Sequence, residues 1–144
     1  MPATPDQVWQ ALTAAETLPS WLGKLDSGTF EVDQVITIEH APNYFCTSKV
    51  RRCETQKLLA MSWQFPDEEP SELQIELIGR ESTTELRLVH RGLTGETASY
   101  LIGWHTHLLY LEYLIAGTPR PMDDFWSLYD QLASASEYGE TNAK

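Results

Sequence analysis

The sequence contains few cysteines and few basic residues. Its two cysteines, Cys46 and Cys53, are too few for a disulfide framework, and they lie in a strand-like segment that does not have the spacing of a zinc site. Ten Lys and Arg against 21 Asp and Glu give a formal net charge of −11. This charge repels phosphate backbones and anionic lipid surfaces. We therefore expect reduced thiols, no bound metal and no nucleic-acid partner.

The sequence also has no long apolar run. A membrane-spanning helix needs about 20 predominantly apolar residues, and the nearest candidate, residues 97–117, is interrupted by His105, His107 and Glu112. The first residues, MPATPDQVW, lack the basic segment and apolar run of a secretory signal. These observations predict a cytoplasmic protein without a membrane span.

The motifs of the common catalytic sites are missing as well. There is no G-x-S-x-G nucleophile elbow, no phosphate-binding loop and no H-E-x-x-H zinc motif. His105 and His107 are two residues apart, which on a helix places them about 200° apart, so they cannot bind one ion together. No catalytic residue, metal or cofactor is predicted from these patterns.

The chain is organised around residues 97–117, the longest segment with helical apolar periodicity. Gly117, Pro119 and Pro121 end it. Gly103 inside this helix is unfavourable and indicates that a neighbour packs closely there. At about 100° per residue, one predicted inward stripe contains Leu101, Trp104, His105, Leu108, Leu111, Glu112 and Ile115.

The segment before this helix alternates apolar and polar residues, as in antiparallel strands. The expected strands are residues 29–32, 35–40, 44–53, 57–65, 73–78 and 84–91, with a tight hairpin at Asp33 and Gln34. One face is apolar and the other solvated, which predicts a sheet covered on one side. Short helices are expected over 5–14, 16–22 and 122–132. Residues 1–132 then form a single domain, and the small polar residues 133–144 a disordered tail.

Four sequence segments carry a resemblance to a known family. PDQVWQALTAAETLPSWLG, KLLAMSW, TELRLVHRGL and GWHTHLLYLEYL, in this order, resemble the START or birch-pollen-allergen-like (SRPBCC) superfamily, in its bacterial branch similar to activators of the heat-shock-protein-90 ATPase. The resemblance implies an α+β helix-grip fold, in which a curved antiparallel sheet wraps around a long C-terminal helix. It also implies a hydrophobic cavity between the two.

The chain departs from the family pattern at its start, because the usual first strand before the first helix is missing. Either the start is truncated, or the strand over 84–91 forms an open sheet edge, and open edges pair readily with other strands. We expect either a homodimer through this edge or an edge shielded by Arg87 and Arg91.

The candidate ligand-binding residues combine the resemblance with the predicted inward faces. They are Trp63, Phe65, Leu88, His90, Trp104, His105, Leu108 and Glu112. His105 and Glu112 would be polar anchors in an apolar pocket, or Glu112 would lie at the cavity mouth or pair with Arg120 or a strand arginine. His40 and His90, at inward strand ends, would contact a ligand or bond to the backbone. Aromatic residues at these spacings are equally typical of a filled core.

The sequence thus supports three functions. The leading hypothesis is a module that binds a small hydrophobic molecule, lipid-like or aromatic. The second is a co-chaperone-like interaction domain for a heat-shock ATPase in a stress response, which only the resemblance supports. The third is a cyclase or hydrolase that uses His105 and Glu112, or His90, as acid and base.

Overall fold

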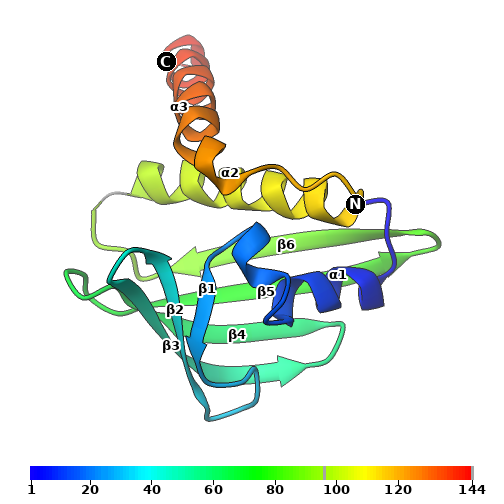
Figure 1. Ribbon diagram of the computed structural model, residues 1–144. Helices are drawn as coiled ribbons and strands as arrows, with labels where there is room; N and C mark the ends of the chain where they lie inside the picture. The colour runs from blue at the N-terminus through cyan, green and yellow to red at the C-terminus, as the bar shows by residue number, and fades with distance from the viewer. Residues whose placement is uncertain (96, 144) are drawn as a thin grey trace.

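The computed structural model describes the backbone of residues 1–95 and 97–143, and the side chains of residues 1–95 and 97–135. The elements are α1 (Pro5–Thr13), η1 (Leu18–Ser20), β1 (Lys24–Ser27), β2 (Val35–Ala41), β3 (Tyr44–Glu54), β4 (Leu58–Trp63), β5 (Ser71–Arg80), β6 (Thr83–Arg91), α2 (Thr97–Ile115), η2 (Met122–Asp124) and α3 (Phe125–Ala143). Within the described residues, the strands form one antiparallel sheet in the order β1-β2-β3-β4-β5-β6 (Figure 1). The predicted α+β helix-grip fold is confirmed.

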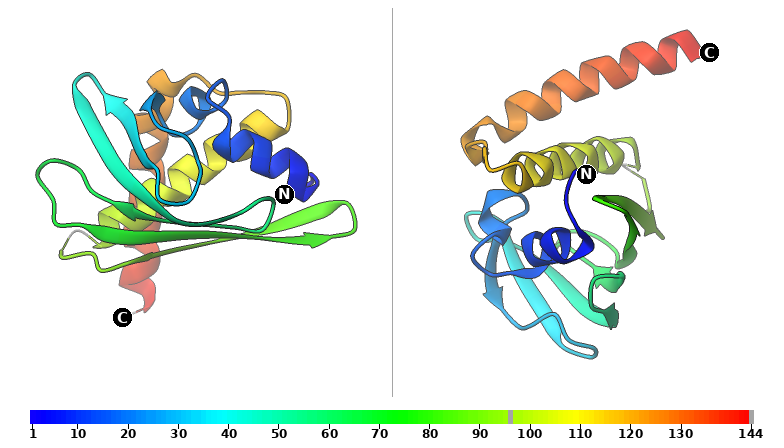
Figure 2. Two further views of the ribbon diagram at one scale, coloured as in Figure 1. Left: turned by 90° about the horizontal axis from the view of Figure 1, so that it is seen from below. Right: turned by 90° about the vertical axis from the view of Figure 1, so that its right-hand side faces the viewer.

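The helices cover one face of this sheet. α2 lies across the sheet, and α3 crosses α2 on the side away from the sheet (Figure 2). α1 packs against α2, β5 and β6. The hydrophobic core lies between α1, α2 and the concave face of the sheet. Because α3 lies on the other side of α2, this helix has protein on two opposite sides.

The first helix begins as its sequence predicts. Thr4 and Gln7 form a reciprocal capping box, and Pro5 occupies the first helical position, where its missing N–H costs nothing. Val8 and Leu12 are buried on its inner face. This anchors α1 over the end of the sheet opposite to the cavity described below.

The central strands confirm the predicted alternation. Leu59, Met61 and Trp63 of β4 are buried, and the register places Leu59 opposite Ile75 and Met61 opposite Leu73. Adjacent inward side chains therefore form continuous apolar rows under α2. Continuing the same alternation past the end of β4 keeps Phe65 on the inner face as well.

The predicted strand over 29–32 and its hairpin at Asp33 and Gln34 are wrong. The strand that pairs with β2 is β1, with Lys24 opposite Glu39, and residues 28–34 form a loop. Asp33 has a positive φ of 71° and donates its N–H to the Val50 carbonyl at 2.9 Å, which fastens this loop to β3. β1 has the sequence KLDS, which contains a single apolar residue and so has no alternation to detect.

β6 forms one edge of the sheet, as predicted, and β1 forms the other. No described strand precedes α1, but the Met1 amino group donates to the Thr84 carbonyl at 2.9 Å, and the Thr84 N–H donates to the Met1 carbonyl at 2.9 Å. This exchange is one hydrogen-bonded pair of an antiparallel ladder. It covers β6 at Thr84 and leaves residues 85–91 at the edge of the sheet.

The C-terminal segment forms a longer helix than the predicted one over 122–132. It begins with η2 and continues as α3 to Ala143. The final turns of α3 project away from the sheet and α2 (Figure 1). The disorder of residues 133–144 stays a prediction. Among the described residues, no helix is long and apolar enough to cross a membrane.

Candidate functional site

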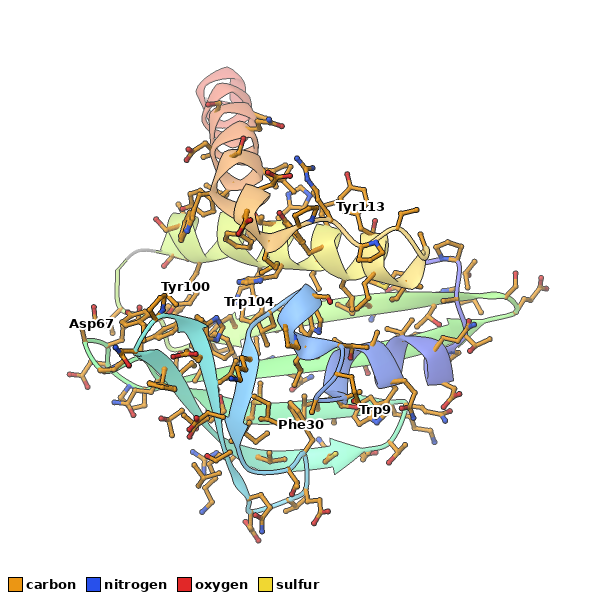
Figure 3. All side chains as sticks on the ribbon, in the orientation of Figure 1. Trp9, Phe30, Asp67, Tyr100, Trp104 and Tyr113 are labelled. Atoms are coloured by element: carbon orange, nitrogen blue, oxygen red, sulfur yellow. The ribbon has the colours of Figure 1, made fainter. Side chains whose placement is uncertain are left out.

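A cavity of about 400 Å³ lies between the sheet, α2 and the start of α3. Its walls come from the ends of β2, β3 and β4, from one face of α2 and from the first turns of α3. The lining residues are Leu22, His40, Ala41, Tyr44, Trp63, Phe65, Glu68, Ser99, Tyr100, Gly103, Trp104, His107, Met122, Phe125, Trp126 and Tyr129. Figure 3 labels Tyr100 and Trp104, which descend from α2 toward the strands, and Asp67 in the loop at the edge of this region.

Aromatic rings form the sheet side of this cavity. Trp63 and Phe65 point inward because both continue the alternation of β4, and Tyr44 stacks on Phe65 with ring centroids 4.6 Å apart. Trp104 of α2 meets Trp63 edge-on at 4.9 Å. Such contacts between rings fix their orientation more firmly than apolar burial alone. The cavity therefore has a well-ordered aromatic wall.

The first turn of α3 forms the roof. Tyr110 of α2 donates its hydroxyl to the Pro121 carbonyl at 2.9 Å, which fixes the turn before α3. Phe125 is buried, with its ring 4.6 Å from that of His107, whereas Trp126 lines the cavity and is 67% exposed. Trp126 thus lies at the mouth, where solvent and the interior meet.

Two neutral histidines line the interior. The Nδ1 atom of His107 lies 2.7 Å from the Trp21 carbonyl, and because a carbonyl only accepts, Nδ1 carries the proton and Nε2 is an acceptor. The ring of His40 lies 6.1 Å from that of His107, and its Nε2 is buried without a hydrogen-bond partner among the described residues. Burial lowers the pKa of His40 to about 3 and that of His107 to about 4.

His90 lies behind the cavity wall and positions it. Trp104 Nε1 donates to His90 Nδ1 at 3.0 Å, so the proton of this ring is on Nε2, which donates to Ser71 Oγ at 2.7 Å. Ser71 Oγ donates in turn to the Trp63 carbonyl at 3.1 Å. Burial lowers the pKa of His90 to about 4. This chain connects the two tryptophans of the wall through a neutral imidazole.

The polar rim of the cavity is acidic. Tyr100 donates its hydroxyl to Glu68 and accepts from Trp63 Nε1 at 3.3 Å, and Tyr44 donates to Asp67 at 2.7 Å. Desolvation, together with the Asp67 carboxylate, raises the pKa of Tyr44 to about 12. No Lys or Arg is among the lining residues. An anionic ligand would find no compensating charge here.

The structure brings together some of the predicted site residues. Trp63, Phe65 and Trp104 line the cavity, and His90 supports it from behind. The other four lie outside the lining: Leu88 and Leu108, which are partly buried against the core, and His105 and Glu112, which are exposed.

The prediction that His105 and Glu112 face the cavity is therefore wrong. α2 packs on the sheet with one side and on α3 with the other, so it is apolar over most of its circumference and its inner face is difficult to identify from periodicity. The proposed pairing of Glu112 with Arg120 is not found either, because Arg120 lies 3.7 Å from Asp124.

Sequence reasoning missed two features of α2. His107 lies three residues after Trp104 and so shares its helix face, which was the available signal. Gly103 was expected to make a close contact, but a Cβ atom built on it meets nothing within 4 Å, since it borders the cavity. This glycine leaves space open.

Structural comparison places the fold among bacterial proteins. CalU16 from Micromonospora echinospora superposes with a TM-score of 0.76 at 22% identity, covering 94% of this chain and 80% of CalU16. DynU16, from the dynemicin biosynthetic locus, gives 0.73 at 25% identity, covering 83% of this chain and 46% of DynU16. The Aha1 dimer from Colwellia psychrerythraea gives a TM-score of 0.65 at 24% identity, covering 80% of this chain and 90% of the Colwellia chain.

Sequence comparison identifies the family. No curated protein matches this chain. The sequence model of one family, described as "Activator of Hsp90 ATPase homolog 1-like protein", matches residues 2–115. These residues include α1, every strand and α2, and therefore most of the cavity wall. The chain belongs to the Activator of Hsp90 ATPase homolog 1-like protein family.

Proposed function

We propose that this protein binds a small, uncharged hydrophobic molecule in the cavity under α2 and α3. The observation that carries the proposal is open space of about 400 Å³ walled by ordered aromatic rings. Ligand pockets typically have volumes of about 300–1,000 Å³ and apolar walls with a few polar groups. The absence of Lys and Arg from the lining, next to the carboxylate of Glu68, argues against an anionic ligand.

The ionisation of the cavity histidines supports binding over acid–base catalysis. A general base works best when its pKa lies near the operating pH. Burial holds the pKa of His40 at about 3 and that of His107 at about 4, which makes both weak bases at neutral pH. A cyclase or hydrolase mechanism through His105 and Glu112 has no geometric support, because both side chains are exposed.

Gly103 offers a direct test of the cavity. A Cβ atom at this position meets nothing within 4 Å, so a leucine would begin in open space and occupy part of the cavity, whereas an alanine adds only a methyl group. We expect the neutral fluorescent probe N-phenyl-1-naphthylamine to bind the wild type and Gly103→Ala, and to lose at least about tenfold in affinity for Gly103→Leu, since burial of its naphthyl and phenyl groups is worth several kcal/mol. Native mass spectrometry of the freshly purified protein would identify any ligand that co-purifies.

Two outcomes would contradict the proposal. Wild-type protein that binds neither the probe nor any co-purifying molecule would indicate a cavity that is closed in solution. Equal affinities of Gly103→Leu and Gly103→Ala would place the probe elsewhere, for example on exposed apolar residues such as Leu101.

A protein-interaction role is the second candidate, and the description of the family favours it. We infer a homodimer through the edge of β6, consistent with the dimeric Colwellia relative, and a cytosolic location as expected from the sequence. Activation of a heat-shock ATPase stays a prediction. It is checked by the ATPase rate of a bacterial heat-shock protein 90 with and without this chain, and an unchanged rate would remove it.

A further inference from the structure

The polar groups inside the cavity indicate more about its ligand than its apolar walls do. His107 Nε2 is an acceptor, since Nδ1 donates to the Trp21 carbonyl. His40 Nε2 is buried without a partner among the described residues. A buried polar atom without a hydrogen bond costs about 1–3 kcal/mol, so His40 Nε2 favours a ligand that satisfies it, and His107 Nε2 offers an acceptor in the same cavity.

The two imidazoles are near enough to act on one group. Their rings lie 6.1 Å apart and nearly perpendicular, and both border the same cavity. His40 is also held edge-on by Phe65 at 5.0 Å and by Trp63 at 5.5 Å, so the aromatic wall fixes its orientation. A ligand ring lying on this wall would carry its substituent to the gap between the two histidines.

A hydroxyl group fits this gap better than other substituents. It donates to His107 Nε2, and it either donates to or accepts from His40 Nε2, whichever tautomer His40 adopts. A carboxylate cannot donate to an acceptor nitrogen, and the nearby Glu68 would repel it. An ether or a methoxyl group also lacks the required proton.

We propose that the natural ligand is a hydroxylated arene whose hydroxyl group hydrogen-bonds to His40 and His107 while its rings lie against Trp63 and Trp104. This inference rests on the proposed function, because it specifies the ligand class of the same cavity. The cavity of about 400 Å³ has room for two or three fused rings.

The test compares three ligands of the same ring size by calorimetry: 2-naphthol, 2-methoxynaphthalene and 2-naphthoate. We expect 2-naphthol to bind the wild type tightest, about tenfold better than 2-methoxynaphthalene, a factor within the range of one net hydrogen bond. 2-Naphthoate should bind weakest. His40→Phe keeps a flat ring in the wall and removes both nitrogens, so it should abolish the preference for 2-naphthol and leave the affinity for 2-methoxynaphthalene unchanged.

His105→Phe is the matched control, because His105 lies on the exposed side of the same helix. It should alter none of the three affinities. If none of the three arenes binds the wild type, the proposed function fails and this inference with it. If all bind but 2-methoxynaphthalene or 2-naphthoate equals 2-naphthol, arene binding stands and the hydroxyl inference is overturned. A preference for 2-naphthol that survives in His40→Phe also overturns the hydroxyl inference. If His40→Phe does not fold, the comparison of the three ligands on the wild type still tests it.

Discussion

The buried histidines make the stability of this protein dependent on pH. The folded-state pKa is about 3 for His40 and about 4 for His107, both below the ordinary value of 6.5. Between pH 6.5 and pH 4 the unfolded chain therefore binds more protons than the folded chain does. The free energy of unfolding falls as the pH falls through this window. The destabilisation is complete only below the folded-state pKa values.

We predict a loss of about 2 kcal/mol in the free energy of unfolding for each of these two histidines between pH 7 and pH 5. Urea denaturation at the two pH values measures it. His107→Leu should remove the loss contributed by one histidine, about 2 kcal/mol. His105→Leu, on the exposed side of α2, should leave the pH dependence unchanged. A free energy of unfolding that is constant over this range would show that the histidines ionise normally.

The hydrogen-bond chain behind the cavity depends on Ser71. This buried hydroxyl accepts from His90 Nε2 and donates to the Trp63 carbonyl. Ser71→Ala removes both bonds and leaves a buried N–H without a partner, so we predict a destabilisation of about 1–3 kcal/mol. Ser127→Ala, at an exposed position of α3, is the control. Equal stability of the two variants in urea would show that water replaces the lost hydroxyl.

Some residues of the site were predictable and others were not. Trp63 and Phe65 follow from the alternation of β4, because in a strand each side chain faces opposite to its neighbours. The pairing of His40 with His107 joins β2 to α2, which are distant in the sequence, and depends on how the helix sits on the sheet. No local pattern contains that information.

At the scale of elements, the rotation of α2 about its axis was the main error. The predicted stripe was centred near Leu108 and already included Trp104 and Leu111, whereas the observed inner face contains these two residues together with His107. The difference is roughly a fifth of a turn. An amphipathic helix on a surface has one apolar face, but α2 is covered by the sheet and by α3. The residues of α2 that contact α3 form a second apolar side, and this second side shifted the predicted inward stripe.

Phe125 and Trp126, neighbours in the first turn of α3, are expected to have different roles, one in stability and the other in ligand binding. Phe125 is buried against His107 and Tyr110, so Phe125→Ala should cost about 3–5 kcal/mol in the free energy of unfolding. Trp126 is 67% exposed and lines the cavity mouth. Trp126→Ala should leave the melting temperature nearly unchanged and weaken binding of N-phenyl-1-naphthylamine. If Trp126→Ala does not affect the probe, the roof is not part of the binding site.

At the scale of the molecule, the edge of β6 is the feature that bears on assembly. Thr84 directs its N–H and C=O away from β5, toward Met1, and residues 86, 88 and 90 share that orientation. Two copies of β6 can therefore pair antiparallel with Leu88 opposite Leu88. In this register Glu85 of each copy lies opposite Arg91 of the other. The formal net charge of −11 per chain opposes association of two copies. Attraction between Glu85 and Arg91 would therefore favour this register over registers that lack the pair.

We predict that the wild type is a dimer in multi-angle light scattering at high protein concentration and that Arg91→Glu weakens it. The substitution places two like-charge pairs across the interface, each worth about 0.2–1 kcal/mol, which raises the dimer Kd by up to about thirtyfold. Arg87→Glu makes the same change in net charge on the same strand but faces Val89, so it should have the smaller effect. A monomeric mass for the wild type would exclude the β6 dimer, and equal effects of the two variants would show that net charge alone, and not this register, governs association.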